Sequence, residues 1–176
     1  MRKKLRDEQG LTLVEMLCAV AILMLLGLMM NTGMQMAVRS YQDVVAQSEV
    51  QLLLSTLSDA LADDLRYARD VKTAADGVLL SYSSDSYNSG GQAKLEIGGN
   101  GQVVAGGKRV LPDGAYGNGA YKVQEMSISY QTQAGGSFFT VRLKVGQAEG
   151  GISAETEFTV RCLSGPKLAD GEESGG

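Results

Sequence analysis

A run of twenty residues near the N-terminus, residues 11–30, constrains this chain more than any other feature. The run is apolar throughout except for Thr12, Glu15 and Gly27. A helix of this length extends about 30 Å, which matches the hydrocarbon core of a bilayer. The sequence therefore predicts a single transmembrane helix over residues 11–30.

Glu15 is the unusual residue of this run, because it places a carboxylate inside the apolar segment. A charged side chain at membrane depth costs about 2.5–3.5 kcal/mol on insertion scales, and such residues are usually paired. Two interpretations follow. In the first, the side chain of Glu15 reaches the interface and has no further role. In the second, Glu15 has a partner that stabilises it within the membrane.

The residues before the run form a short polar leader that ends at Gly10. It contains four basic residues, Arg2, Lys3, Lys4 and Arg6. An excess of Lys and Arg beside an apolar run marks the cytoplasmic side, so we expect the rest of the chain to lie outside the cytoplasm. A secretory signal has an apolar region of about 7–15 residues followed by a small-residue cleavage site. The longer run, and the lack of an A-x-A pattern after it, argue against such a signal.

The end of the leader and the start of the apolar run resemble the prepilin signal of the type IV pilin and pseudopilin family. The residues that carry the resemblance are Gly10, Thr12, Leu13, Val14 and Glu15. Most members of this family begin their mature chain with Phe, where this sequence has Leu11. Minor pilins and pseudopilins tolerate that difference, so the resemblance favours one of these over a major pilin.

The resemblance implies a processing site and an assembly residue. Prepilin peptidase, a membrane-embedded aspartyl peptidase, would cleave between Gly10 and Leu11 and methylate the new amine of Leu11. In the family, the residue at the place of Glu15 pairs with the N-terminal amine of a neighbouring subunit and sets the stagger between subunits. Each charge alone is costly to bury, and the pair removes most of that cost.

The resemblance also implies partners and a location. The partners would be prepilin peptidase, other pilin or pseudopilin subunits, a cytoplasmic assembly ATPase, a membrane platform protein and membrane lipid. The chain would be a single-pass membrane protein with a cytoplasmic leader, and part of a surface fibre after assembly. That fibre could belong to a type IV pilus, a type II secretion system or a competence system. The alternative is an uncleaved, signal-anchored extracellular binding or sensor domain that keeps its leader.

Composition argues against several other functions. The chain has no His, which excludes Ser-His-Asp and Cys-His catalytic sites and His metal ligands. The segment after the apolar run contains 12 Lys and Arg against 17 Asp and Glu, so no basic surface for direct nucleic-acid binding is expected. Cys18 and Cys162 lie in the membrane run and far outside it, so they are not expected to pair. We expect no enzymatic activity and no cofactor.

Two acidic groups were considered as metal sites and rejected. Asp63 and Asp64 are adjacent on a predicted helix and point about 100° apart, so both are expected on solvated helix surface. Asp85 and Glu96 fall at the first and twelfth positions of a calcium loop, but Tyr87 stands at the third position and no helices are expected beside it. The sequence therefore predicts no metal site.

The pattern after residue 30 predicts an α+β fold. Apolar residues recur at helical spacing up to residue 70, which predicts an amphipathic half of the N-terminal helix over residues 31–70. An antiparallel β domain is expected over residues 71–163 and a polar, flexible tail over residues 164–176. The strands expected in the β domain cover residues 78–82, 94–97, 102–104, 109–111, 122–131, 138–145 and 152–162.

Overall fold

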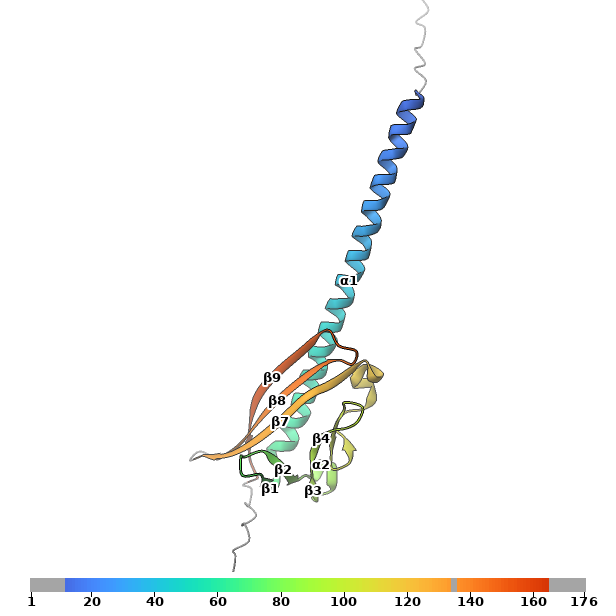
Figure 1. The fold of residues 1–176 in the computed structure, drawn as a ribbon. Helices are drawn as coiled ribbons and strands as arrows, with labels where there is room; N and C mark the ends of the chain where they lie inside the picture. The colour runs from blue at the N-terminus through green and yellow to red at the C-terminus, as the bar shows by residue number, and fades with distance from the viewer. Residues whose placement is uncertain (1–11, 134–135, 165–176) are drawn as a thin grey trace, which may run out of the picture. The chain divides into compact units, whose positions relative to one another are not determined.

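The computed structural model describes residues 12–133 and 136–164. The chain divides into two compact units, one ending at Val44 and the other beginning at Val45. Helix α1 (Leu13–Arg66) starts in the first unit and ends in the second, and antiparallel sheets follow it. The predicted α+β arrangement, with one long N-terminal helix before antiparallel strands, is confirmed (Figure 1).

The described strands of the second unit form three antiparallel sheets of three strands each. The first sheet contains β1 (Arg69–Thr73), β2 (Leu79–Ser83) and β3 (Gln92–Ala93). The second contains β4 (Leu95–Ile97), β5 (Val103–Ala105) and β6 (Lys108–Arg109). The third contains β7 (Tyr121–Gln133), β8 (Gly136–Gln147) and β9 (Ser153–Cys162). Two short helical segments, α2 (Asp85–Asn88) and η1 (Asp113–Gly119), lie in the connections.

The third sheet is the predicted meander, and a bulge explains its side-chain pattern. Val123 pairs with Val145, whereas Glu125 pairs with Lys144, so Gln124 is an extra residue in β7. An extra residue reverses which face the following side chains occupy. As a result Val123 and Ile128, five residues apart, are both buried.

The core of the second unit lies between α1 and the inner face of the third sheet. The helix contributes a stripe of fully buried side chains at helical spacing, Val50, Leu57, Leu61 and Leu65. Strand β8 contributes every second residue, namely Phe139, Val141, Leu143 and Val145, all fully buried. Apolar side chains that recur about every 3.6 residues along the helix therefore pack against apolar side chains at every second residue of the strand. Leu52, which was expected on this stripe, is instead exposed.

The helix ends four residues before the predicted limit at residue 70. The backbone N–H groups of Tyr67 and Ala68 bond to carbonyl groups three residues earlier, which tightens the last turn. The chain then enters β1, a strand that was not predicted, and Asp70, its second residue, has a positive φ of 45°. Apolar spacing alone missed this change because Ala68 and Val71 are both buried and continue the helical pattern.

The prediction that Asp64 lies on solvated helix surface is wrong. Asp64 is only 6% exposed, and its carboxylate accepts hydrogen bonds from the hydroxyls of Tyr82 and Ser84. The distance from Ser84 Oγ to Asp64 Oδ1 is 2.6 Å. Asp63, its neighbour, is exposed as expected. Burial, together with the hydrogen bond to Asp64, raises the pKa of Tyr82, so the phenol remains a donor.

Ser84 extends this cluster into the connection after β2. Its hydroxyl also accepts a bond from the backbone N–H of Tyr87 at 3.2 Å and so caps the short helix α2. No helix was predicted in this segment. Asp64 of α1 is therefore linked through Ser84 to the segment between β2 and β3 of the first sheet.

Gly101 provides a test of local backbone constraint. It has a φ of +75°, and a Cβ built there would lie 2.5 Å from Cβ of Lys122. We expect Gly101→Ala to destabilise the second unit by more than about 2 kcal/mol, because left-handed strain of about 1–2 kcal/mol adds to a clash. Gly107→Ala is the matched control, since its φ is +84° but its Cβ would meet nothing within 4 Å.

Chemical denaturation of both variants, followed by tyrosine fluorescence, measures this difference in the full chain held in detergent micelles. Tyrosine is the natural probe because the sequence has no Trp. Equal destabilisation of the two variants would show that the close approach to Lys122 is relaxed at no cost.

Candidate processing and assembly site

The site predicted from the sequence lies at the start of the chain, and part of it can be located. Gly10 and Leu11, the predicted cleavage and methylation residues, lie outside the described residues. Thr12 is the first residue with a described position, and α1 begins at Leu13. Glu15, the predicted assembly residue, lies in the first turn of α1.

Thr12 caps the helix on which Glu15 lies. Its side-chain Oγ1 accepts a bond from the backbone N–H of Glu15 at 3.3 Å, and its carbonyl accepts bonds from the N–H groups of Glu15 and Met16. Thr at the N-cap and Glu three residues later form the pattern of a capping box. The cap fixes the start of the helix immediately before the carboxylate. Sequence reasoning missed this role, although the spacing Thr-x-x-Glu was available to indicate it.

The position of Glu15 has an electrostatic consequence. The first turn of a helix carries the positive end of the macrodipole, so a carboxylate is favoured there by about 0.3–1 kcal/mol at an exposed site. This is less than the cost of taking a charge to membrane depth. The helix start therefore reduces the penalty for Glu15 but does not remove it.

The side chains around Glu15 are apolar and exposed in the isolated chain. Leu13, Val14 and Met16 are 81%, 69% and 62% exposed, and the large apolar side chains that follow as far as Met30 are also exposed. Among the described residues, α1 is the one helix long and apolar enough to cross a membrane. Exposure of an apolar surface this extensive is expected of a helix that lies in lipid or against other helices.

Comparison with known families assigns this end of the chain to a class. Residues 5–31 match the prokaryotic N-terminal methylation motif. The chain thus carries the leader signal of type IV pilin-like proteins, as its sequence indicated. The match includes Gly10, Leu11 and Glu15 but covers no part of the β domain.

The motif supports a pilin-like protein that is processed by prepilin peptidase and assembles with other pilin subunits. It points to a structural subunit, and with the long apolar helix it fits a single-pass membrane anchor. Comparison with curated proteins gives no match, and comparison with solved structures gives none either.

The acidic residues considered for metal binding have other partners. Asp85 pairs with Arg69, and Glu96 pairs with Lys94. Within residues 12–133 and 136–164, no group of three or more acidic or Cys side chains is placed to hold a metal ion. Cys162 is buried, with Sγ 3.3 Å from the carbonyl oxygen of Ala68, and burial raises the pKa of its thiol.

Proposed function

We propose that this chain is a minor pilin or pseudopilin, stored in the membrane after processing and then assembled into a type IV pilus, type II secretion or competence fibre. Prepilin peptidase would cleave between Gly10 and Leu11 and methylate Leu11. The observation that carries the proposal is the methylation motif over residues 5–31, with Glu15 held in the first turn of an apolar helix.

Glu15 supplies the assembly step in this proposal. Cleavage creates a positive amine on Leu11, four residues before the carboxylate of Glu15. When the amine of one subunit meets Glu15 of the next, two charges that are costly to bury alone become a pair. Leaving one partner of a buried pair unmatched costs about 3–5 kcal/mol, which disfavours the isolated subunit and misregistered contacts.

The remaining assignments follow from this scheme. Residues 1–10 are the leader, residues 11–30 are the membrane half of the helix, and the amphipathic half runs from residue 31 to the end of α1. The β domain faces away from the cytoplasm, as the basic leader suggests. An assembly ATPase and a membrane platform protein are the proposed machinery. Leu11 in place of the usual Phe favours a minor pilin or pseudopilin.

Processing is tested by mass spectrometry of the N-terminus in cells that contain prepilin peptidase. We expect a mature chain that starts at methylated Leu11. A catalytically inactive peptidase is the control and should leave residues 1–10 attached. A retained leader in the presence of active peptidase would contradict the proposal and favour a signal-anchored extracellular domain.

A further inference from the structure

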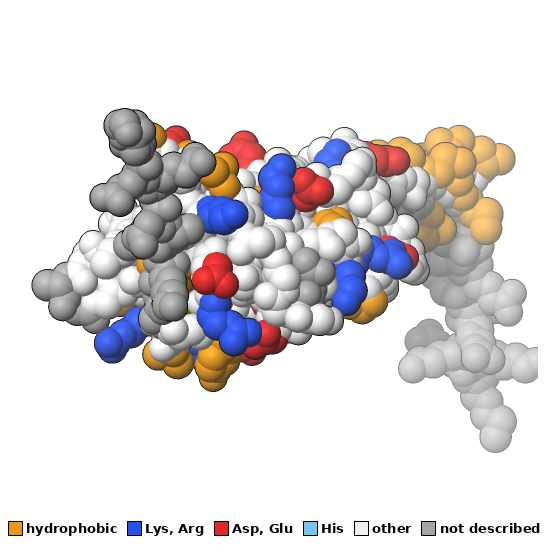
Figure 2. All heavy atoms as spheres, turned by 90° about the horizontal axis from the view of Figure 1, so that it is seen from below, with side chains coloured by type: hydrophobic (Ala, Val, Ile, Leu, Met, Phe, Trp, Pro, Cys, Tyr) orange, Lys and Arg blue, Asp and Glu red, His pale blue; other side chains and the backbone are white. Residues whose placement is uncertain are grey.

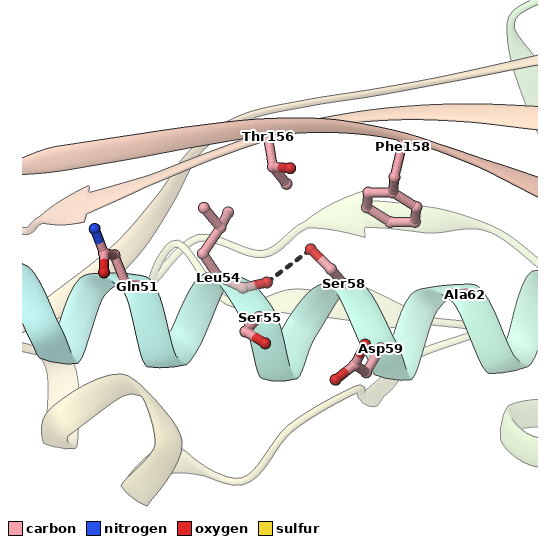
Figure 3. Close-up of a pocket in the computed structure, with 8 residues that line it drawn as sticks. All are labelled: Gln51, Leu54, Ser55, Ser58, Asp59, Ala62, Thr156 and Phe158. Carbon is pink, nitrogen blue, oxygen red and sulfur yellow. Dashed lines mark hydrogen bonds between the residues drawn. The ribbon is translucent and has the colours of Figure 1, made fainter.

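A cleft of about 440 Å³ lies between the C-terminal part of α1 and strand β9. Figure 3 shows Thr156 and Phe158 pointing from β9 toward the helix, and Leu54 and Ser58 lying opposite them. Ser58 donates its hydroxyl proton to the carbonyl of Leu54 at 2.7 Å, so its hydrogen-bonding capacity is partly used within the helix. The remaining lining residues are Gln51, Ser55, Asp59 and Ala62.

The cleft exists because the helix covers β9 incompletely. Val160 and Cys162 on the inner face of β9 are buried, whereas Ala154, Thr156 and Phe158 on the same face are only half-buried. The helix residues opposite them are mostly small, which leaves room beside the strand. Complete removal of an apolar ring such as that of Phe158 from water is more favourable in free energy than partial burial.

Strand β9 is also an open edge of its sheet. Its ten residues pair with β8 on one side, and no described strand lies on the other. An open edge presents backbone N–H and C=O groups that a further strand can satisfy. The cleft lies beside this edge, where a fourth strand would cover the flank of α1. Edge strands flanked by a groove bind extended peptides through main-chain bonds and alternate side chains.

The cleft itself is lined by a single charge, which is acidic. Asp59 is the one charged residue that lines the cleft, and it has no ion-pair partner among residues 12–133 and 136–164. Glu155 and Glu157 project from the other face of β9, where Arg142 engages Glu157. Figure 2 shows Lys, Arg, Asp and Glu side chains intermixed over one face of the molecule. The cleft therefore favours a segment with a basic residue.

We propose that β9 and the adjoining flank of α1 bind an extended segment of a partner protein as an added β-strand. Apolar side chains of that segment fill the space beside Phe158, and a Lys or Arg lies beside Asp59. This surface is separate from the N-terminal site, so its test does not depend on the processing of Gly10 and Leu11 or on Glu15.

A second copy of this chain fits the surface less well. The open edges of the first two sheets are strands of two to five residues, too short for the ten-residue edge of β9. The other edge of the third sheet, β7, already bonds to the backbone of Gly77 and Gly101. Pairing of β9 with β9 of another copy would bring two such clefts together, each lined by the negative side chain of Asp59. A foreign segment of opposite charge avoids both difficulties.

The probe is a synthetic eight-residue peptide of alternating Lys and Val with one central Phe, blocked at both ends. It is titrated against the full chain in nanodiscs of neutral lipid, and amide hydrogen exchange is followed in β9. We expect slower exchange at the outward-facing amides of β9. A peptide with Glu in place of Lys should bind at least about tenfold more weakly, as should a peptide N-methylated at alternate amides.

Three variants separate a specific site from general adhesion. Phe158→Ala should weaken peptide binding about tenfold, because it removes the main apolar contact of the cleft. Asp59→Asn should weaken it about threefold, as expected for one exposed ion pair. Thr159→Ala is the matched control on the outer face of the same strand and should leave affinity unchanged.

The outcomes that overturn the proposal are distinct. The proposal is excluded if a millimolar concentration of peptide does not slow amide exchange in β9. It is also excluded if the Phe158 and Thr159 variants bind the peptide equally well. Concentration-dependent protection of β9 without peptide identifies a second copy as the occupant. Protection that disappears when residues 165–176 are deleted identifies the chain's own C-terminal segment. None of these results alters the N-terminal mass that tests processing.

Discussion

Replacement of Glu15 with Ala should leave the leader cleaved at the normal site and reduce incorporation into fibres below detection. The proposed cleavage depends on residues at the junction between Gly10 and Leu11, whereas the proposed role of Glu15 begins only when the new amine meets a neighbour. Loss of the carboxylate leaves that amine unpaired, a loss of about 3–5 kcal/mol per contact. Because each subunit repeats the contact, an effect of this size is sufficient to stop assembly.

The measurement compares N-terminal masses of membrane-bound chain with the amount of chain in sheared fibres. Glu15→Gln keeps the size of the side chain without its charge and should fail as Ala does, whereas Glu15→Asp should retain partial incorporation. Thr12→Ala removes the cap on the same turn and should reduce incorporation less, since a cap contributes about 1 kcal/mol. Normal incorporation of Glu15→Ala would refute the assembly role of this residue.

Replacement of Asp64 with Ala is expected to give the largest stability loss among single polar substitutions in the second unit. The change leaves the buried hydroxyls of Tyr82 and Ser84 without their acceptor. Hydrogen bonds to a charged group contribute about 1.5–3 kcal/mol each, and the two effects are not fully additive. We expect a decrease of about 3 kcal/mol in the free energy of unfolding.

Asp63→Ala is a closely matched control, because the substitution is the same and the position differs by one residue. Its side chain is 76% exposed and lies 3.5 Å from Arg66, so a change within about 0.5 kcal/mol is expected. Asp64→Asn should fall between the two, since an amide retains one acceptor oxygen. Denaturant unfolding of the full chain gives all three values. Equal effects at both positions would mean that the cluster around Asp64 contributes little.

The fold was largely predictable because its main periodicities are long and regular. The apolar run of residues 11–30, the helical spacing of Leu57, Leu61 and Leu65, and the alternation in β8 each identify their element without tertiary information. The strand β1 was not predictable in the same way. It contains a positive φ at Asp70 and a buried Val71, and only the packed structure determines both features.

The two acidic sites show what a sequence can and cannot reveal. Glu15 stands out because its neighbours are uniformly apolar, so its cost is evident from the sequence alone. Asp64 does not stand out, because an acidic residue on an amphipathic helix is ordinary. Its partners Tyr82 and Ser84 lie 18 and 20 residues away and meet it only after the chain folds back.

The distance along the chain between the two halves of the core has a kinetic consequence. The helix stripe around Leu57 is covered by side chains such as Phe139, which is synthesised more than eighty residues later. Contacts of such wide sequence separation form slowly. While the C-terminal strands are still being synthesised, the helix stripe stays exposed to water and prone to aggregation. The core of the second unit is therefore complete only after its last strand has been synthesised.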